Sequence, residues 1–94
     1  TSAQEIAVYR IVQEAFANIR KHARANRVYL SLLESEKRVE AKIEDNGIGF
    51  DPKNIKKGNG LLNMKTRTQD NGGVFRLQTA PGKGTIIRVE FPKD

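Results

Sequence analysis

The sequence predicts a two-layer α+β fold in which two helices lie on one face of a mainly antiparallel sheet. Apolar residues recur at helical spacing at the start of the chain and again after a glycine-rich loop. A pair of alternating, strand-like segments follows each helical pattern. The 94-residue length is enough for one such core and too short for two. We therefore expect residues 1–94 to form a single domain.

The first predicted helix begins near Ala3 and runs to about Arg24. Ser2 and Glu5 have the spacing of a capping box, which satisfies the first backbone N–H groups of a helix. Six apolar residues then recur three or four positions apart, and we expect this stripe to face the core. Its members are Ile6, Tyr9, Val12, Phe16, Ile19 and Ala23.

The first predicted hairpin follows this helix. Apolar and polar residues alternate over residues 28–32 and again over residues 39–43, which is typical of strands. The polar stretch 34–37 between them predicts the turn. After the hairpin, the pattern breaks into a loop over residues 45–60 that contains glycines and lysines.

A second helix and a second hairpin complete the fold. The helix is expected over residues 61–69, and Gly72 with Gly73 ends it because glycine adopts the left-handed conformation that closes a helix. Val74, Phe75 and Leu77 predict the third strand, and residues 85–91 predict the fourth.

Composition limits the classes of function. Basic residues outnumber acidic ones by 17 to 11, and the resulting charge of +6 favours an anionic partner: nucleic acid, an acidic membrane or a phosphorylated small molecule. A solvated basic surface would have the same composition. There is no cysteine, which excludes disulfides and cysteine-based zinc sites. The chain begins with Thr1 and the helical pattern starts at once, so we interpret it as a fragment of a longer protein.

Four polar residues share one face of the first helix at spacings of three, four and one. Glu14, Asn18, Lys21 and His22 together would suit a metal-bound phosphate chain. Asn18 offers an oxygen ligand for Mg²⁺, Lys21 a positive charge for phosphate, and Glu14 a base or water-orienting group. The alternative is an ordinary polar face in solvent.

The sequence DNGIGF follows the second strand directly. Asp45 at a strand end can accept a hydrogen bond from a donor such as the exocyclic amine of adenine. Gly47 and Gly49 allow a tight turn and let a ligand approach the backbone. A hairpin turn or a calcium-binding turn would explain the same residues.

Two further glycine segments are candidate contacts. Gly58 and Gly60 lead into the helix that starts at Leu61, where backbone N–H groups and the helix dipole favour a phosphate. Thr85 follows Gly84 at the start of the last strand and could bring a hydroxyl to the same site. Either segment could also be a plain turn. The P-loop pattern is absent.

Taken in order, these segments resemble the GHKL ATPase superfamily, which includes gyrase B, MutL and a heat-shock chaperone. YRIVQEAFANIRKHARA is similar to its N box, DNGIGF to its G1 box and GNGLLNMKTR to its G2 box. The ending GGVFRLQTAPGKGTIIRVEFP is similar to the closing strands of the histidine-kinase branch. The G2 form GxGLxxMxxR resembles sensor kinases that partner NarL/LuxR-type response regulators. The resemblance implies the Bergerat form of the α/β sandwich.

The resemblance also implies roles for particular residues. Asn18 would bind Mg²⁺, Asp45 would recognise the adenine amino group, and Gly47 with Gly49 would line the base pocket. Glu14 matches the glutamate that activates water in hydrolytic members. The other expected ATP contacts are Lys21, His22, Gly58, Gly60 and Leu61 near the phosphates, with a mobile lid around the glycines, and Thr85 at the adenine end through water.

The implied function is to bind Mg–ATP and supply the γ-phosphoryl group to a histidine in a dimerisation domain, for relay to a NarL/LuxR-type regulator. His22 belongs to the N box and is not the phosphorylated residue. The fragment would be a monomeric cytoplasmic domain of a membrane-bound sensor, with little transfer activity alone. One alternative is an anti-sigma-factor serine kinase of the same superfamily. A nucleic-acid-binding module is supported only by the charge, so we expect no nucleic-acid partner.

Overall fold

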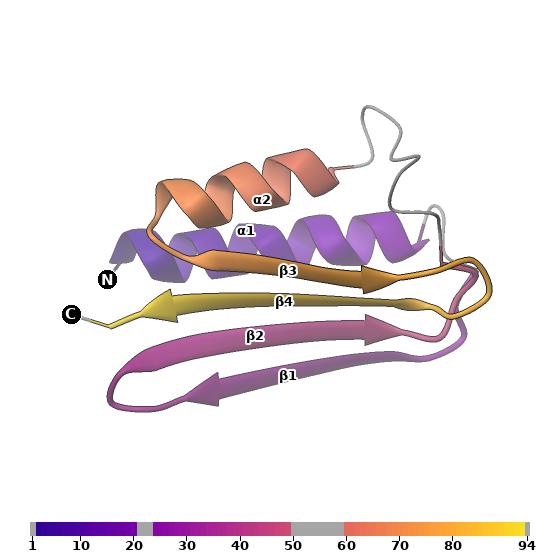
Figure 1. Ribbon diagram of the computed structural model, residues 1–94, viewed down its shortest axis with the longest axis horizontal. Coiled ribbons are helices and arrows are strands. Elements are labelled where there is room, and N and C mark those ends of the chain that lie inside the picture. Colours follow the sequence, from indigo (N-terminus) through magenta and orange to yellow (C-terminus); the bar gives the residue numbers. More distant parts are fainter. Residues whose placement is uncertain (1, 21–23, 50–59, 94) are drawn as a thin grey trace.

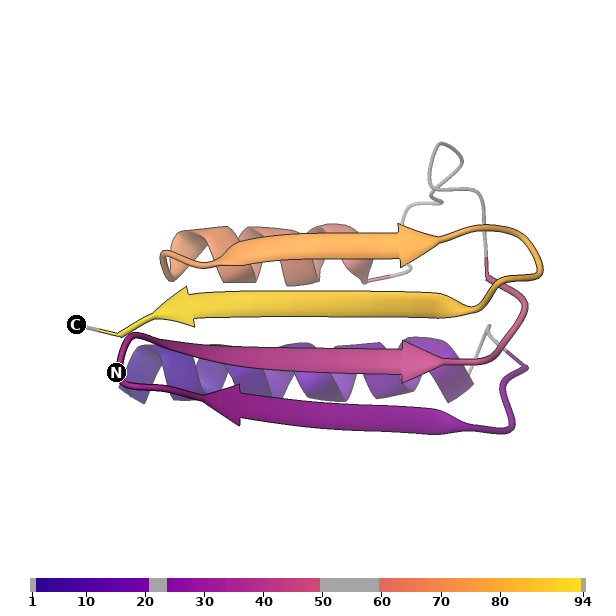
Figure 2. The same cartoon turned by 60° about the horizontal axis from the view of Figure 1, so that its bottom comes forward.

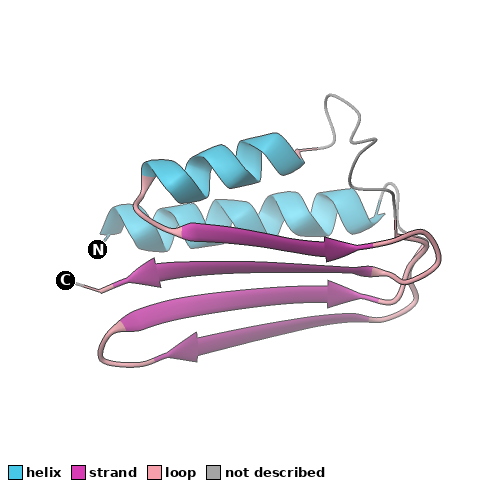
Figure 3. Ribbon diagram, in the orientation of Figure 1, coloured by secondary structure: helices cyan, strands magenta, loops and turns pink. Residues whose placement is uncertain are grey.

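The computed structural model describes residues 2–20, 24–49 and 60–93. Its helices and strands follow the predicted order and lie close to the predicted positions (Figure 3). The elements are α1 (Ser2–Asn18), β1 (Val28–Glu34), β2 (Arg38–Asp45), α2 (Leu61–Asp70), β3 (Val74–Thr79) and β4 (Thr85–Pro92).

The four strands form one antiparallel sheet in the order β1-β2-β4-β3. Both helices lie on the same face of this sheet, and no described helix or strand covers the opposite face (Figures 1 and 2). The predicted two-layer α+β architecture is confirmed. Among the described residues, no helix is both long and apolar enough to cross a membrane.

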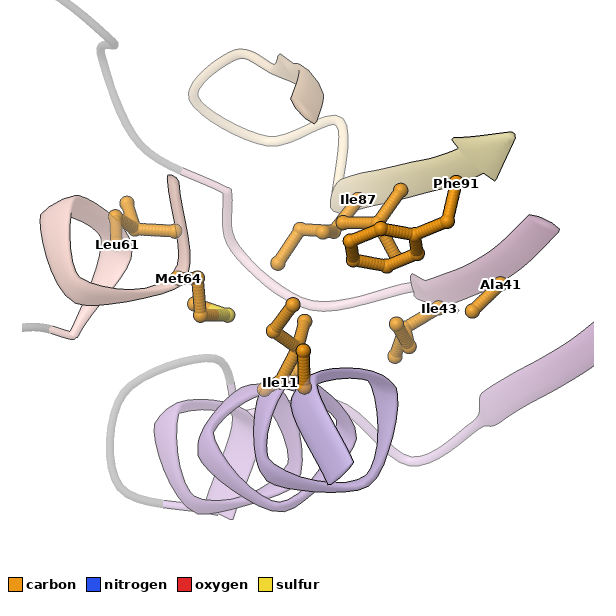
Figure 4. Packing of buried hydrophobic residues seen from close by; sticks show 10 residues of the cluster. Ile11, Ala41, Ile43, Leu61, Met64, Ile87 and Phe91 are labelled. Atoms are coloured by element: carbon orange, nitrogen blue, oxygen red, sulfur yellow. The ribbon is translucent and has the colours of Figure 1, made fainter. Parts of the chain in front are cut away.

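The core lies between the central strands and the two helices (Figure 4). Side chains from β2 and β4 point toward the helices, and Ile11 of α1 and Met64 of α2 meet them there. Because β2 and β4 are central strands, alternate residues along each are almost fully buried. The buried apolar residues are Ala7, Ile11, Ala15, Ala41, Ile43, Leu61, Met64, Ile87, Val89 and Phe91.

The predicted core stripe of α1 is wrong in part. The fully buried face consists of Ala7, Ile11 and Ala15, with Val8, Val12 and Ile19 partly buried beside it. Three members of the predicted stripe are exposed instead: Ile6 by 56%, Tyr9 by 65% and Phe16 by 39%. Their spacing is helical, but at about 100° per residue they lie roughly opposite Ile11. Two small alanines on the inner face allow the helix to pack closely on the sheet.

The predicted end of α1 near Arg24 borders residues 21–23, which lie outside the described part of the chain. The regular α-helix ends at Asn18, and Arg24 has a φ of 51°, which no right-handed helix contains.

The end of α2 was predicted correctly by its glycines. Gly72 has a φ of 80°, and its N–H donates to the carbonyl of Gln69. The N–H of Gly73 donates to the carbonyl of Thr68, which completes a Schellman motif. A Cβ on Gly73 would lie 2.7 Å from the Phe91 ring, so this glycine also makes room for the largest core residue.

β1 is a true strand but contributes nothing to the buried core. It pairs only with β2 and is exposed along its whole length. Val28, Leu30 and Leu32 face the helix side, because their partners on β2 do so, yet within the described part of the chain nothing buries them.

Candidate functional site

One end of the sheet gathers the polar residues that the sequence singled out. Asp45 is the last residue of β2 and pairs with Thr85, the first residue of β4, which in turn pairs with Thr79, the last residue of β3. The three residues therefore form one row across the sheet on its helix side. The carboxyl end of α1 and the amino end of α2 lie at the same end of the molecule (Figure 1).

Asp45 is a buried carboxylate with one satisfied oxygen. The residue is 5% exposed, and its Oδ1 accepts a 2.8 Å hydrogen bond from the Gly47 N–H. Burial raises the pKa of Asp45 above its usual value, and the charge of Glu44 adds to this, while the bond from Gly47 acts in the opposite direction. An acidic group held in such a position is suited to receive a hydrogen-bond donor from a ligand.

The glycines after Asp45 join the DNGIGF turn to the turn between β3 and β4. Gly49 has a φ of 63°, and a Cβ there would lie 2.1 Å from the carbonyl oxygen of Ala80. The N–H of Gly82 donates to the carbonyl of Ile48 at 2.6 Å. Backbone therefore packs directly on backbone, and only glycine fits at position 49.

Asn46 is a structural residue that the sequence interpretation missed. Its Oδ1 accepts from the N–H groups of Asn26 and Arg27 at 3.1 and 3.0 Å, and its Nδ2 donates to the Asn26 side chain. These bonds fix the start of β1 to the turn that follows Asp45. The only signal for this role in the sequence is the position of Asn46 inside the DNGIGF motif.

Glu14 and Asn18 lie on the inner part of α1. Both residues are half-buried, on the same side of the helix as buried Ile11. These two side chains are therefore only partly exposed to solvent.

The amino end of α2 packs against Glu14. Gly60 is the N-cap, with a φ of 83° and no side-chain cap. A Cβ on Gly60 would lie 2.1 Å from Glu14 Oε1. Leu61 is 5% exposed, and its side chain belongs to the core.

Several predicted contacts fall outside the described residues. These are Lys21, His22 and Gly58, together with most of the expected lid, residues 50–59. The structure therefore brings together Glu14, Asn18, Asp45, Gly47, Gly49, Gly60, Leu61 and Thr85 at one end of the molecule.

A groove of about 310 Å³ runs between α1 and α2 on the side of Glu14. Arg10 and Arg67 line it, and within the described residues neither forms an ion pair. Arg67 is the last residue of the GxGLxxMxxR pattern, whereas Arg10 was not predicted to take part. The two arginines place positive charge beside the middle of α1 and the last turn of α2.

The donor set fits a hard divalent cation that is shared with phosphates. Among the described residues there is no cluster of three or more histidine, cysteine, aspartate or glutamate side chains. Asn18 and Glu14 offer oxygen atoms one helical turn apart. Magnesium commonly takes only one or two protein oxygens and completes its shell with water and substrate phosphates.

Comparison with known proteins agrees with this geometry. The family model described as histidine kinase-, DNA gyrase B-, and HSP90-like ATPase matches residues 3–94. The signal transduction histidine-protein kinase/phosphatase DegS of Brevibacillus brevis is 42% identical over 89 residues, which are 94% of this chain and 23% of DegS. The sensor histidine kinase LiaS of Bacillus subtilis (strain 168) is 38% identical over 86 residues, 90% of this chain and 24% of LiaS.

One solved structure is similar to this chain in both fold and sequence. The crystal structure of the ATP binding domain of PrrB from Mycobacterium tuberculosis matches with a TM-score of 0.78 and 29% identity, covering 95% of this chain and 68% of that one. The chain spans only 23% and 24% of the lengths of the DegS and LiaS relatives. Since the family model covers all but the first two residues, this chain belongs to the family of histidine kinase-, DNA gyrase B-, and HSP90-like ATPases.

Proposed function

We propose that residues 1–94 are the ATP-binding domain of a sensor histidine kinase. The domain binds Mg–ATP and supplies the γ-phosphoryl group to a histidine of a separate dimerisation domain. The observation that carries this proposal is the row formed by Asp45 and Thr85, two buried polar residues at the end of the sheet where α1 ends and α2 begins. Buried polar groups that converge at one end of a fold are the usual basis of a ligand site.

Asp45 and Thr85 hold the adenine end of the nucleotide in this proposal. One oxygen of Asp45 is occupied by the Gly47 N–H, so the other is available to accept from the amino group of adenine. Thr85 acts beside it, through a water molecule. Gly47 and Gly49 line the base pocket.

Asn18 and Gly60 hold the phosphate end. Asn18 would supply an oxygen to Mg²⁺, with Glu14 next to it, and the bound ion would neutralise charge on the phosphates during transfer. Gly60 and the backbone of Leu61 present the amino end of α2 to the phosphates. Lys21, His22 and Gly58 also belong to this part of the proposal.

The role of the whole protein is also part of the proposal. The DegS and LiaS relatives are named as histidine kinases, which favours histidine over serine as the acceptor. The basic charge is explained by a phosphorylated ligand, so no nucleic-acid partner is needed. We infer a cytoplasmic, monomeric domain of a membrane-bound sensor that passes its phosphoryl group to a NarL/LuxR-type regulator.

Calorimetric titration of ADP with Mg²⁺ tests the binding site. We expect the chain to bind ADP, and Asp45→Asn to weaken binding by at least about tenfold because one acceptor becomes a donor. Asn18→Ala should remove the dependence of affinity on Mg²⁺ and leave metal-free ADP binding intact. A chain that binds no nucleotide would contradict the proposal.

Labelled ATP tests the transfer step. The chain alone should bind ATP and form almost no stable phosphohistidine, because the acceptor histidine lies in another domain. Efficient phosphorylation of the isolated chain would contradict this division of labour.

A further inference from the structure

Thr79 is joined to the proposed adenine end by a short hydrogen-bonded chain. It pairs with Thr85 across β3 and β4, and the two Oγ1 atoms are 2.9 Å apart. The Thr79 Oγ1 also donates to the carbonyl oxygen of Gly84 at 3.0 Å. Thr79 is half-buried, and it lies outside every residue role that the sequence motifs suggested.

The direction of these two bonds follows from proton counting. A threonine hydroxyl carries one hydrogen, and a carbonyl oxygen can only accept. Since Thr79 gives its hydrogen to Gly84, the bond between the two hydroxyls requires Thr85 to be the donor. The hydrogen of Thr85 is therefore held by Thr79, and Thr85 presents only lone pairs to anything else that approaches it.

Asp45 presents the same polarity next to Thr85 in the row. When ionised, its carboxylate accepts only, and one of its oxygens already accepts from the Gly47 N–H. Two neighbouring acceptors suit an amino group, because Asp45 can accept from it directly, and a water that donates its two hydrogens to Asp45 and Thr85 has only lone pairs left to accept from it. They oppose a carbonyl oxygen at the same place, because acceptor would then face acceptor.

We propose that Thr79 is a positioning and specificity-determining residue: by holding the hydrogen of Thr85, it makes the site select a 6-aminopurine over a 6-oxopurine. The inference rests on the proposed binding of an adenine nucleotide and adds the reason for the base preference. Thr79 itself does not touch the base. Its effect is transmitted by the orientation of one hydroxyl group.

The test compares ADP with IDP, which carries a 6-oxo group in place of the 6-amino group. Dissociation constants for both are measured by calorimetry for the unmodified chain, Thr79→Val and Thr79→Ser. Valine keeps the shape of threonine but cannot accept a hydrogen bond, so Thr85 becomes free to donate its hydrogen to the bridging water, which can then donate one of its own hydrogens to a 6-oxo group. The ratio of the IDP to the ADP dissociation constant should fall about three- to tenfold, which corresponds to one hydrogen bond.

Serine at position 79 is the matched control because it restores the hydroxyl. Thr79→Ser should retain the ratio of the unmodified chain. If Thr79→Val does not fold, Thr79→Ala gives the same comparison without a bulky apolar side chain.

The outcomes separate the inference from the proposed function. If Thr79→Val leaves the ratio of the two dissociation constants unchanged, the inference is overturned. If ADP and IDP binding are also both weaker, the residue only supports the fold. In both of these cases ADP binding by the unmodified chain would leave the proposed function standing. Absence of nucleotide binding by the unmodified chain would overturn both.

Discussion

The two ends of the sheet are built differently. At the end near the two termini, Phe91 is 1% exposed, and its ring packs against Gly73. At this glycine the Schellman motif ends α2. The Gln4 side chain donates to the carbonyls of Asn71 and Pro92 at this end. At the other end, the corresponding buried positions hold Asp45 and Thr85, and the connections are glycine turns.

This difference indicates where the fold obtains its stability and where it does not. An apolar ring buried in a close-packed layer stabilises the folded state. A buried carboxylate with a raised pKa does the opposite at neutral pH, because ionisation is less favourable there than in water. Residues that reduce stability persist mainly where a ligand uses them.

The largest expected effect comes from the apolar end. Phe91→Ala should lower the free energy of unfolding by about 3–5 kcal/mol, because it removes a fully buried ring and leaves a cavity. Urea unfolding measures this loss. Val74→Ala is the control on the open face, where the side chain is 47% exposed, and it should change stability far less. Similar losses for the two variants would contradict the proposed difference between the ends.

Asp45→Asn should show the reverse behaviour. ADP affinity falls, whereas the free energy of unfolding at pH 7 rises, since asparagine needs no ionisation and can still accept from the Gly47 N–H. The folded state raises the pKa of Asp45 above 3.8, so the unmodified chain loses stability as pH rises through the folded pKa. The advantage of the variant should therefore shrink as pH falls toward 3. A variant that is less stable at pH 7 would show that Asp45 serves the fold.

Gly60 and Gly72 form a matched pair that tests the contact between the start of α2 and Glu14 of α1. Both have φ near 80°, but a Cβ on Gly60 meets Glu14 Oε1 and a Cβ on Gly72 meets nothing within 4 Å. Gly72→Ala should therefore lose only the backbone contribution, about 1–2 kcal/mol. Gly60→Ala should lose more and also weaken ADP binding. Equal losses in thermal unfolding would mean that Glu14 moves aside freely.

The smallest effect is expected from the ion pair between Glu34 and Lys93 at the edge of the sheet. The hydrogen bond and charge of Lys93 lower the pKa of Glu34, so its contribution exists above the usual pKa of 4.5 and is lost as pH falls through the folded value. Glu34 is exposed, and such pairs contribute little. Glu34→Gln should leave the urea midpoint nearly unchanged at pH 7. A large shift of the midpoint would contradict the expectation that this exposed ion pair contributes little to stability.

Local sequence determined the elements, their order and the motif residues of this protein. Alternation predicts strands because side chains change face at every residue, and Gly72 with Gly73 predicts the end of α2 because of their backbone freedom. Asp45 and the glycines after it were identified as a candidate site from their chemical types and their position after a strand. These signals lie within a few residues of one another along the chain.

Tertiary structure alone decided which face of α1 is buried and which residues meet at the end of the sheet. Ile6, Tyr9 and Phe16 have the right spacing for a core stripe, but the sheet packs on Ala7, Ile11 and Ala15 instead. The row of Asp45, Thr85 and Thr79 exists only through strand register. Pairing across strands joins residues far apart in sequence, so no local pattern could reveal that Thr79 holds the hydroxyl of Thr85.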